Sequence, residues 1–211
     1  MKITPPNIPA MISPYMIEQQ EIYPEEEISE CLFTDTLIEN QAAEAAVFSK
    51  VIFRNVTFNQ VSLRNAELTD VRFEKCDLSN VDFSESLMHR VEFINCKIIG
   101  INLSSSTLRN IRFDSCNGSY ANFQFTDWKQ GIFQDCLLVQ ADFYACKLVQ
   151  MQFERCQLKQ AEVSGTSLAG IDLSSCEIEG LSLTIEDLQG CIISAVQTVI
   201  FSKFLGVVIK E

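Results

Sequence analysis

The apolar residues of this chain recur every five positions. Positions ending in 3 or 8, from Phe33 to Ile193, carry a large apolar residue in an unbroken run of 33 units, with Ala43 and Gly118 as the exceptions. A five-residue period matches neither the 3.6-residue turn of an α-helix nor the two-residue alternation of a strand. Each unit therefore needs its own corner, and the chain is predicted to wind into a solenoid with five-residue sides.

A second inward series lies two residues before the first. In the unit Ala66–Asp70 the large residue is Leu68, and in a short extended segment the residue two positions earlier shares its face. Positions ending in 1 or 6 are mostly small or β-branched, whereas the other three positions are mainly polar, as expected at turns and on a solvated surface. Four such sides would close a square coil of 20 residues, with coils stacked about 4.8 Å apart.

In rows of 20 residues the sequence forms columns of constant character. One column holds seven phenylalanines that can stack on one another: Phe33, Phe53, Phe73, Phe93, Phe113, Phe133 and Phe153. Another holds six cysteines: Cys76, Cys96, Cys116, Cys136, Cys156 and Cys176. A triangular coil of three units would scatter both columns. Residues 31–193 are therefore predicted to form about eight square coils, a rod about 40 Å long.

All nine cysteines lie at inward positions. Stacked thiols with parallel Cβ vectors lack disulfide geometry, and the C-x-x-C spacing typical of zinc sites is absent. The chain is thus predicted to hold structural free thiols and no metal or other cofactor, which is typical of a reducing compartment. Residues 1–30 lack a signal-peptide pattern, and no apolar stretch reaches membrane-spanning length. We expect a cytoplasmic protein that makes no contact with a membrane.

Both ends of the chain break the period, and each is expected to cap the solenoid. Residues 1–30, which are acidic, are predicted to form an irregular N-terminal cap. Within residues 194–211, Ser194 and Gln197 have the spacing of a capping box that begins a helix, and Gly206 is expected to end it.

The C-terminal helix is too apolar to bury a single stripe. One face is expected to cover the last coil, and the other to meet the same helix of a second copy in a twofold dimer. The residues assigned to this interface are Val196, Val199, Ile200, Phe201, Phe204 and Leu205. In the alternative arrangement the chain is a monomer whose tail, residues 207–209, folds back over the helix.

The sequence offers no catalytic centre. His89 is the only histidine and occupies an outward position, and no Gly-rich phosphate loop is present. No nucleophile therefore has a base beside it, and the chain is predicted not to be an enzyme.

Gly118 is a local exception in the inward series. The missing side chain would leave a gap or a bend, partly filled by Trp128, or would be compensated by repacking of its neighbours.

The net charge of −12 is unevenly distributed. Residues 1–49 hold −8, and residues 50–183 hold −3. After residue 50, one side of the coil carries Asp82, Glu85, Asp142 and Glu162 against Arg64, and these four acids are the predicted partner-binding residues. A second side, with Lys50, Arg90, Arg109, Lys129 and Lys147 among its residues, has a net charge of +2 up to residue 183.

The overall sign of the charge disfavours direct nucleic-acid binding, which needs a basic stripe. A negative rod could instead occupy a basic DNA-binding groove on another protein. The alternative is that the acids only keep a repeat protein soluble.

Units such as Cys76-Asp77-Leu78-Ser79-Asn80 and Val81-Asp82-Phe83-Ser84-Glu85 resemble the pentapeptide-repeat family, and the resemblance covers residues 31–193. It implies an all-β fold, the right-handed quadrilateral β-helix. The ending, residues 190–197 and 204–209, resembles the C-terminal cap and dimerisation helix of Qnr-type quinolone-resistance proteins, and residues 120–123 are similar to their central stretch.

The resemblance to Qnr-type proteins implies a rod-shaped dimer that mimics DNA, binds DNA gyrase or topoisomerase IV, and protects the enzyme from fluoroquinolones. Many Qnr-type proteins carry loops between coils, and residues 31–193 contain no such insertion. A non-catalytic scaffold for other protein interactions is the alternative. The preferred topoisomerase, and whether protection or inhibition dominates, stay open at this point.

Overall fold

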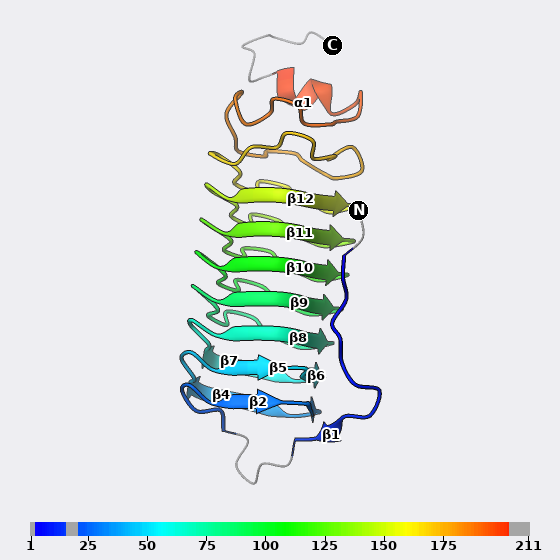
Figure 1. The fold of residues 1–211 in the computed structure, drawn as a ribbon. Coiled ribbons are helices and arrows are strands. Elements are labelled where there is room, and N and C mark those ends of the chain that lie inside the picture. Colours follow the sequence, from blue (N-terminus) through cyan, green and yellow to red (C-terminus); the bar gives the residue numbers. More distant parts are fainter. Residues whose placement is uncertain (1–2, 16–20, 203–211) are drawn as a thin grey trace.

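The chain forms a rod of stacked coils, as Figure 1 shows for a computed structural model that describes residues 3–15 and 21–202. The elements are β1 Ser13–Pro14, β2 Glu27–Ser29, β3 Cys31–Thr34, β4 Leu37–Ala42, β5 Val47–Ser49, β6 Ile52–Arg54, β7 Thr57–Ser62, β8 Glu67–Glu74, β9 Leu87–Ile94, β10 Thr107–Asp114, β11 Asp127–Gln134, β12 Lys147–Glu154 and α1 Thr198–Ser202. The only helix among the described residues, α1, is too short to cross a membrane.

Neighbouring coils pair in parallel with a shift of 20 residues. Phe73 on β8, for example, is opposite Phe93 on β9, which is opposite Phe113 on β10. The stacked strands β3, β6 and β8 to β12 give about seven turns, against the eight expected. In Figure 1 the front strands run from left to right as the chain climbs from β8 to β12, so the solenoid is right-handed. The predicted fold class is thereby confirmed.

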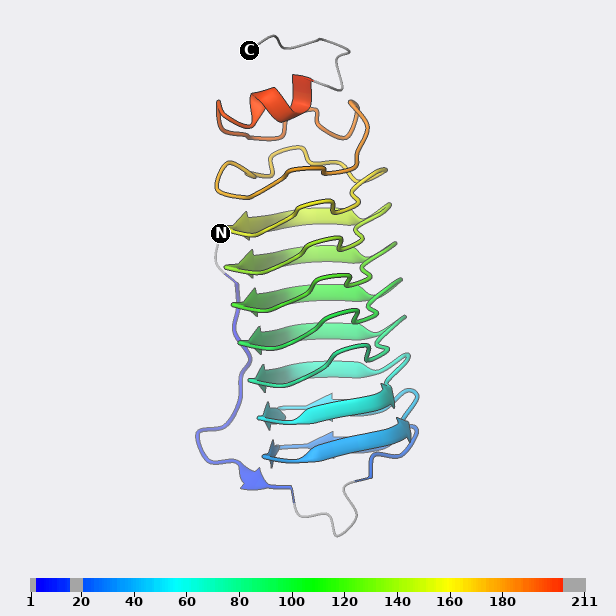
Figure 2. The ribbon, with the colours of Figure 1, turned by 180° about the vertical axis from the view of Figure 1, so that it is seen from behind.

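The wall behind these strands carries fewer hydrogen-bonded strands (Figure 2). There β4 pairs with β7, and above β7 the coils are joined mainly by isolated bridges such as Asp82 to Asn102. The cause is the turn that ends each unit on this wall, which leaves only a residue or two extended. The 20-residue register is unchanged, so side chains still form vertical columns.

Most corners are made by a residue with positive φ. From Glu25 to Gln160, the residue at each position ending in 0 or 5 has a φ between 50° and 64°. This left-handed conformation is easy for glycine and tolerated by asparagine and aspartate, which explains corners such as Asn55, Asn80 and Gly100. The five-residue period is therefore the spacing between these left-handed residues.

The phenylalanine column forms a continuous stack in the core. Adjacent rings from Phe33 to Phe153 have centroids 4.5–5.4 Å apart. Below the column, the ring centroid of Tyr15 lies 4.2 Å from that of Phe33, and the Tyr15 hydroxyl donates to Glu26 Oε1 at 3.3 Å. Burial, followed by the charge of Glu26, raises the pKa of Tyr15. Tyr15 thus closes the lower end of the stack.

The cysteines are free thiols, eight of them buried and Cys191 half-buried. Each Sγ of the cysteine column contacts the backbone oxygen of the phenylalanine 23 residues earlier, as Cys96 does with Phe73 at 3.4 Å. Burial raises the pKa of Cys31 and of Cys146 to about 11, so both thiols are protonated at neutral pH. Within residues 3–15 and 21–202, no cluster of three or more potential ligands is placed to hold a metal.

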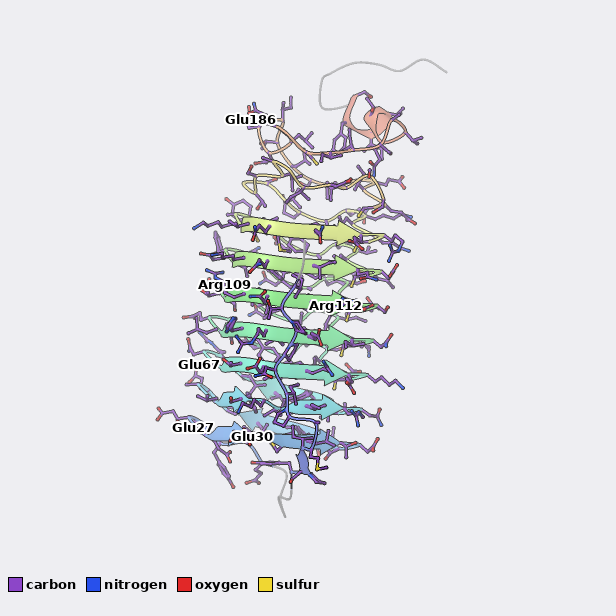
Figure 3. All side chains as sticks on the ribbon, turned by 45° about the vertical axis from the view of Figure 1, so that its right-hand side comes forward. Glu27, Glu30, Glu67, Arg109, Arg112 and Glu186 are labelled. Atoms are coloured by element: carbon purple, nitrogen blue, oxygen red, sulfur yellow. The ribbon has the colours of Figure 1, made fainter. Side chains whose placement is uncertain are left out.

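The N-terminal residues form a strap along the rod. Strand β1 pairs with β3, and residues 3–12 then run beside the coils toward β11, as Figures 1 and 3 show. The Asn7 N–H donates to Asp70 Oδ1 at 2.7 Å, the Thr4 N–H donates to Asn110 Oδ1 at 3.1 Å, and Pro6 is buried. Residues 1–30 were expected to be irregular, yet β2 within them already pairs in register with β5.

The C-terminal cap contains the expected capping box. The Ser194 N–H donates to Gln197 Oε1 at 2.7 Å, and the Gln197 N–H donates to Ser194 Oγ at 3.4 Å. The Gln197 side chain also donates to the backbone oxygens of Leu173 and Cys176, at 2.8 Å each. One glutamine therefore both begins α1 and attaches it to the last coils. Gly206 lies outside the described residues.

Gly118 is accommodated by repacking. A Cβ placed on Gly118 would lie 3.1 Å from Leu138 and 3.2 Å from Ile98, the residues above and below it in the same column. These two side chains close the gap, and the neighbouring strands β10 and β11 stay paired along their length.

Candidate functional site

One side of the rod carries half of the net charge. We call it the acidic side: residues 21–25, 41–45 and each further block 20 residues on, up to 181–185. Its seven acids outnumber its one base, Arg64, for a net charge of −6, and the acids are Glu21, Glu25, Glu44, Asp82, Glu85, Asp142 and Glu162. The corresponding blocks of the other three sides carry −3, −2 and −2.

Three of the four predicted partner-binding acids lie in one vertical column. Bridges link Asp82 to Asn102, Asn102 to Asn122, Asn122 to Asp142, and Asp142 to Glu162. The fourth, Glu85, occupies the corner of the same unit as Asp82. Asp82 and Asp142 are therefore three coils apart, about 14 Å. The other three acids, Glu21, Glu25 and Glu44, escaped sequence reasoning because the 20-residue register was not carried into the N-terminal segment.

The lower acids of this side share one cation. Arg64 lies 3.0 Å from Glu85, and its Nε is 4.0 Å from both Glu44 and Asp82. These side chains are substantially exposed, so the ion pairs contribute little to stability. They nevertheless lower the negative potential around Asp82 and Glu85.

The upper acids have no such neighbour. Asp142 Oδ1 accepts the Tyr144 N–H at 2.9 Å, and its Oδ2 accepts the Gln124 side-chain amide. Glu162 accepts the Ser164 N–H at 2.7 Å. Burial raises the Glu162 pKa, but hydrogen bonds from Ser164, Ser182 and Val163 together outweigh it, so the pKa is lowered. Within residues 3–15 and 21–202, no Lys or Arg nitrogen comes within 4.0 Å of either carboxylate. Asp142 and Glu162 are thus fixed in position and unneutralised.

Three exposed aromatic side chains lie beside these acids. Tyr120 is 61% exposed, Phe125 55% and Tyr144 43%, and the Phe125 and Tyr144 rings meet edge to face at 5.6 Å. Tyr120 and Phe125 are corner residues with φ of 62° and 59°. For residues other than glycine, asparagine and aspartate this conformation costs about 1–2 kcal/mol each. Their signal is present in the sequence, because no other left-handed corner carries an aromatic residue, but it is one of side-chain type and not of charge.

The side that carries Lys50, Arg90, Arg109, Lys129 and Lys147 forms no free basic stripe among the described residues. Arg90 donates to both oxygens of the Asp70 carboxylate, at 2.6 and 2.7 Å, and Asp70 is buried under the strap. Arg109 and Lys147 both contact Asp127. In Figure 3 the strap passes between the labelled Arg109 and Arg112, over the corner at residue 110. Phosphate binding has little support on this side.

His89 is partly buried on β9, against the guanidinium of Arg90. Burial, followed by the Arg90 charge, lowers the His89 pKa, so the imidazole is neutral at pH 7.

A cavity lies where the strand ladder ends. It has a volume of about 470 Å³ between β12 and the next coil, and it is lined by Gln150 to Glu154, Gly170, Asp172, Ser174 and Ser175. In the described part of the chain β12 pairs only with β11, so its upper backbone edge is open. The lining has serines and carboxylates but no histidine or cysteine.

The predicted dimer residues fall into three groups. Val196 and Val199 are 83% and 55% exposed, Ile200 is half-buried, and Phe201 is buried against the last coil. Phe204 and Leu205 lie outside the described residues. The first turn of the helix region therefore presents two exposed valines.

Three family models match successive parts of the chain. They describe a pentapeptide repeat region over residues 66–143, pentapeptide repeats in nine copies over 43–87, and pentapeptide repeats in eight copies over 136–183. The Bacillus subtilis (strain 168) protein YisX is 39% identical over 103 residues. The match spans 49% of this chain and 49% of YisX, so the chain matches only about half the length of this curated relative.

Among solved structures, trypsin-treated QnrB1, a plasmid-mediated fluoroquinolone resistance protein, is similar with a TM-score of 0.57 and 16% identity, over 85% of this chain and all of the other. HetL from the cyanobacterium Nostoc sp. strain PCC 7120, involved in heterocyst differentiation regulation, gives a TM-score of 0.39 and 17% identity, over 81% of this chain and 90% of HetL. At these identities the likeness to QnrB1 is one of fold.

Proposed function

Because this chain is a pentapeptide-repeat protein, we propose that it works by binding, as a DNA mimic that occupies the DNA site of a type II topoisomerase and protects that enzyme from fluoroquinolones. The acidic side, with its net charge of −6, is the observation that carries the proposal. DNA gyrase and topoisomerase IV are the candidate partners, on the strength of the fold shared with QnrB1.

The charge density indicates how such a contact would behave. From Glu21 to Glu162 the acidic side spans about seven coil spacings, roughly 34 Å, which is about one net charge per 6 Å, compared with one per 1.7 Å in DNA. Electrostatic attraction would therefore steer the approach to a basic groove, while other contacts would supply much of the affinity.

The test is gyrase supercoiling with purified protein, with and without ciprofloxacin. Protection predicts that supercoiling returns as the protein is added. Asp142→Lys with Glu162→Lys should abolish it, because these carboxylates are unneutralised. Glu177→Lys with Glu179→Lys is the matched control, since it makes the same charge change on another side. The absence of both protection and inhibition at large excess, with gyrase and with topoisomerase IV, would leave the scaffold function in its place.

We also propose that the protein forms a twofold dimer through its C-terminal cap. Val196 and Val199 are the exposed apolar residues that support it. Sedimentation velocity should show a dimer that Val199→Asp converts to a monomer. Leu87→Asp, which places the same charge at an exposed leucine far from the cap, should leave the dimer intact. A monomeric wild-type protein would contradict the dimer.

A further inference from the structure

We call the exposed residues Tyr120, Phe125 and Tyr144 the aromatic cluster; the Phe125 and Tyr144 rings meet edge to face, and Tyr120 is the corner residue one unit before Phe125. They belong to two successive coils, and the bridge between Asn122 and Asp142 stacks those coils in register. Corner hydrogen bonds fix the backbone of the first two: the Tyr120 N–H donates to the Val139 oxygen at 2.9 Å, and the Phe125 N–H donates to the Tyr144 oxygen at 3.0 Å. Tyr120 and Phe125 thus stand at the two ends of one five-residue side.

The cluster does not serve the fold. Its rings project into solvent, and the backbone under Tyr120 and Phe125 would be relieved by asparagine or glycine. The other left-handed corners of the Tyr120 column are all polar or glycine: Asn40, Gln60, Asn80, Gly100, Gln140, Gln160 and Gly180. Exposed aromatic residues at positions where the other left-handed corners are polar or small are typical of a contact surface.

The acids beside the cluster indicate which groups it would contact. Asp142 is held by the Tyr144 N–H and by Gln124, and neither Asp142 nor Glu162 is neutralised by a described base. A guanidinium group stacks on an aromatic ring and also forms two hydrogen bonds with a carboxylate. A lysine ammonium is more strongly hydrated and lacks the planar fork.

We infer that Tyr120, Phe125 and Tyr144, together with Asp142 and Glu162, form an arginine-binding contact for a partner protein, and that this contact supplies the affinity that the sparse acidic side lacks. The identity of the partner as a topoisomerase rests on the proposed function. The preference for arginine is independent of that function, because it follows from the exposed rings and from two carboxylates that no described base neutralises.

The decisive variants replace the two corner aromatics with asparagine. Tyr120→Asn with Phe125→Asn should raise the melting temperature by a few degrees, because the strained corners relax. The same variant should bind gyrase at least tenfold more weakly. Leu137→Asn is the control, since it removes an exposed apolar side chain from a column that already carries Asn117 and Gln157. Gyrase binding as tight as that of the wild type would overturn the inference.

A second measurement separates this inference from the proposed function. NMR spectra of protein labelled on its Phe and Tyr rings would be recorded with a peptide of alternating Arg and Gly, and with its Lys counterpart. We expect the Arg peptide to shift the Tyr120, Phe125 and Tyr144 signals at several-fold lower concentration, and Asp142→Asn to reduce the shifts. If gyrase binds neither the wild-type protein nor its variants, the peptide titration by itself tests the arginine contact. Equal effects of the two peptides, or unshifted rings at millimolar peptide, would overturn the arginine contact.

Discussion

Removing one ring from the phenylalanine column tests the core packing directly. Phe93 is fully buried, with ring centroids 4.8 Å from Phe73 and 4.5 Å from Phe113 at interplanar angles of 5° and 4°. Phe93→Ala removes two stacked pairs, each about 0.5–1.5 kcal/mol beyond burial. Because β8, β9 and β10 are hydrogen-bonded to one another, the coils cannot collapse into the cavity. We therefore expect a loss in the upper half of the usual range of about 3–5 kcal/mol.

Urea unfolding measures this loss, with the fluorescence of the single tryptophan as the signal. Trp128 is buried, and its ring centroid lies 6.3 Å from Phe113, the neighbour of Phe93 in the column. The midpoint should fall at an unchanged m-value. Phe125→Ala removes the same atoms from an exposed corner and should change stability by less than about 0.5 kcal/mol. A loss below about 1 kcal/mol for Phe93→Ala, or equal losses for both variants, would refute the inward stack.

Two further predictions concern the two terminal segments of the chain, the strap and the C-terminal cap. The Arg90 hydrogen bonds, opposed by burial and assisted by the Asn7 N–H, lower the Asp70 pKa. The ionised Asp70 therefore stabilises the strap fully at pH values above its ordinary pKa of about 3.9. This stabilisation is lost as the pH falls through the lower pKa of the folded state. Hydrogen exchange at the Asn7 amide should thus be slow at pH 7 and faster in Asp70→Asn; equal rates would contradict the attachment. Gln197→Ala should cost about 1–2 kcal/mol in thermal unfolding, since the capping box and two buried hydrogen bonds are lost. An unchanged melting temperature would show that α1 is held by other contacts.

The repeat made most of the solenoid predictable. Two inward residues per unit and a 20-residue register leave few ways to wind the chain, so the sequence alone places Phe93 on Phe73. The capping box at Ser194 was equally readable, because its hydrogen bonds are local. These features depend on residues close in sequence or separated by whole coils.

The strap and the split of the acidic side were not predictable in the same way. No period links Asn7 to Asp70 or Thr4 to Asn110, and both contacts depend on where an aperiodic segment leaves the first coil. The three acids around Arg64 include Glu44 and Glu85, whose contact with one guanidinium is decided by rotamers. Tyr120 and Phe125 stood at known corner positions, but only the backbone φ shows how poorly an aromatic residue suits them.

The strap also imposes an order on the synthesis of the molecule. Thr4 leaves the ribosome 106 residues before Asn110, and Asn7 leaves 63 residues before Asp70. At ordinary elongation rates Thr4 waits roughly 5–20 s for its partner. Coils can stack on one another as they emerge, since each needs only its neighbour. The strap residues are therefore made before the coils that they contact, and they are fixed only after those coils have formed. Once in place they join the earliest coils to later ones, so that the rod cannot peel open from its N-terminal end one coil at a time.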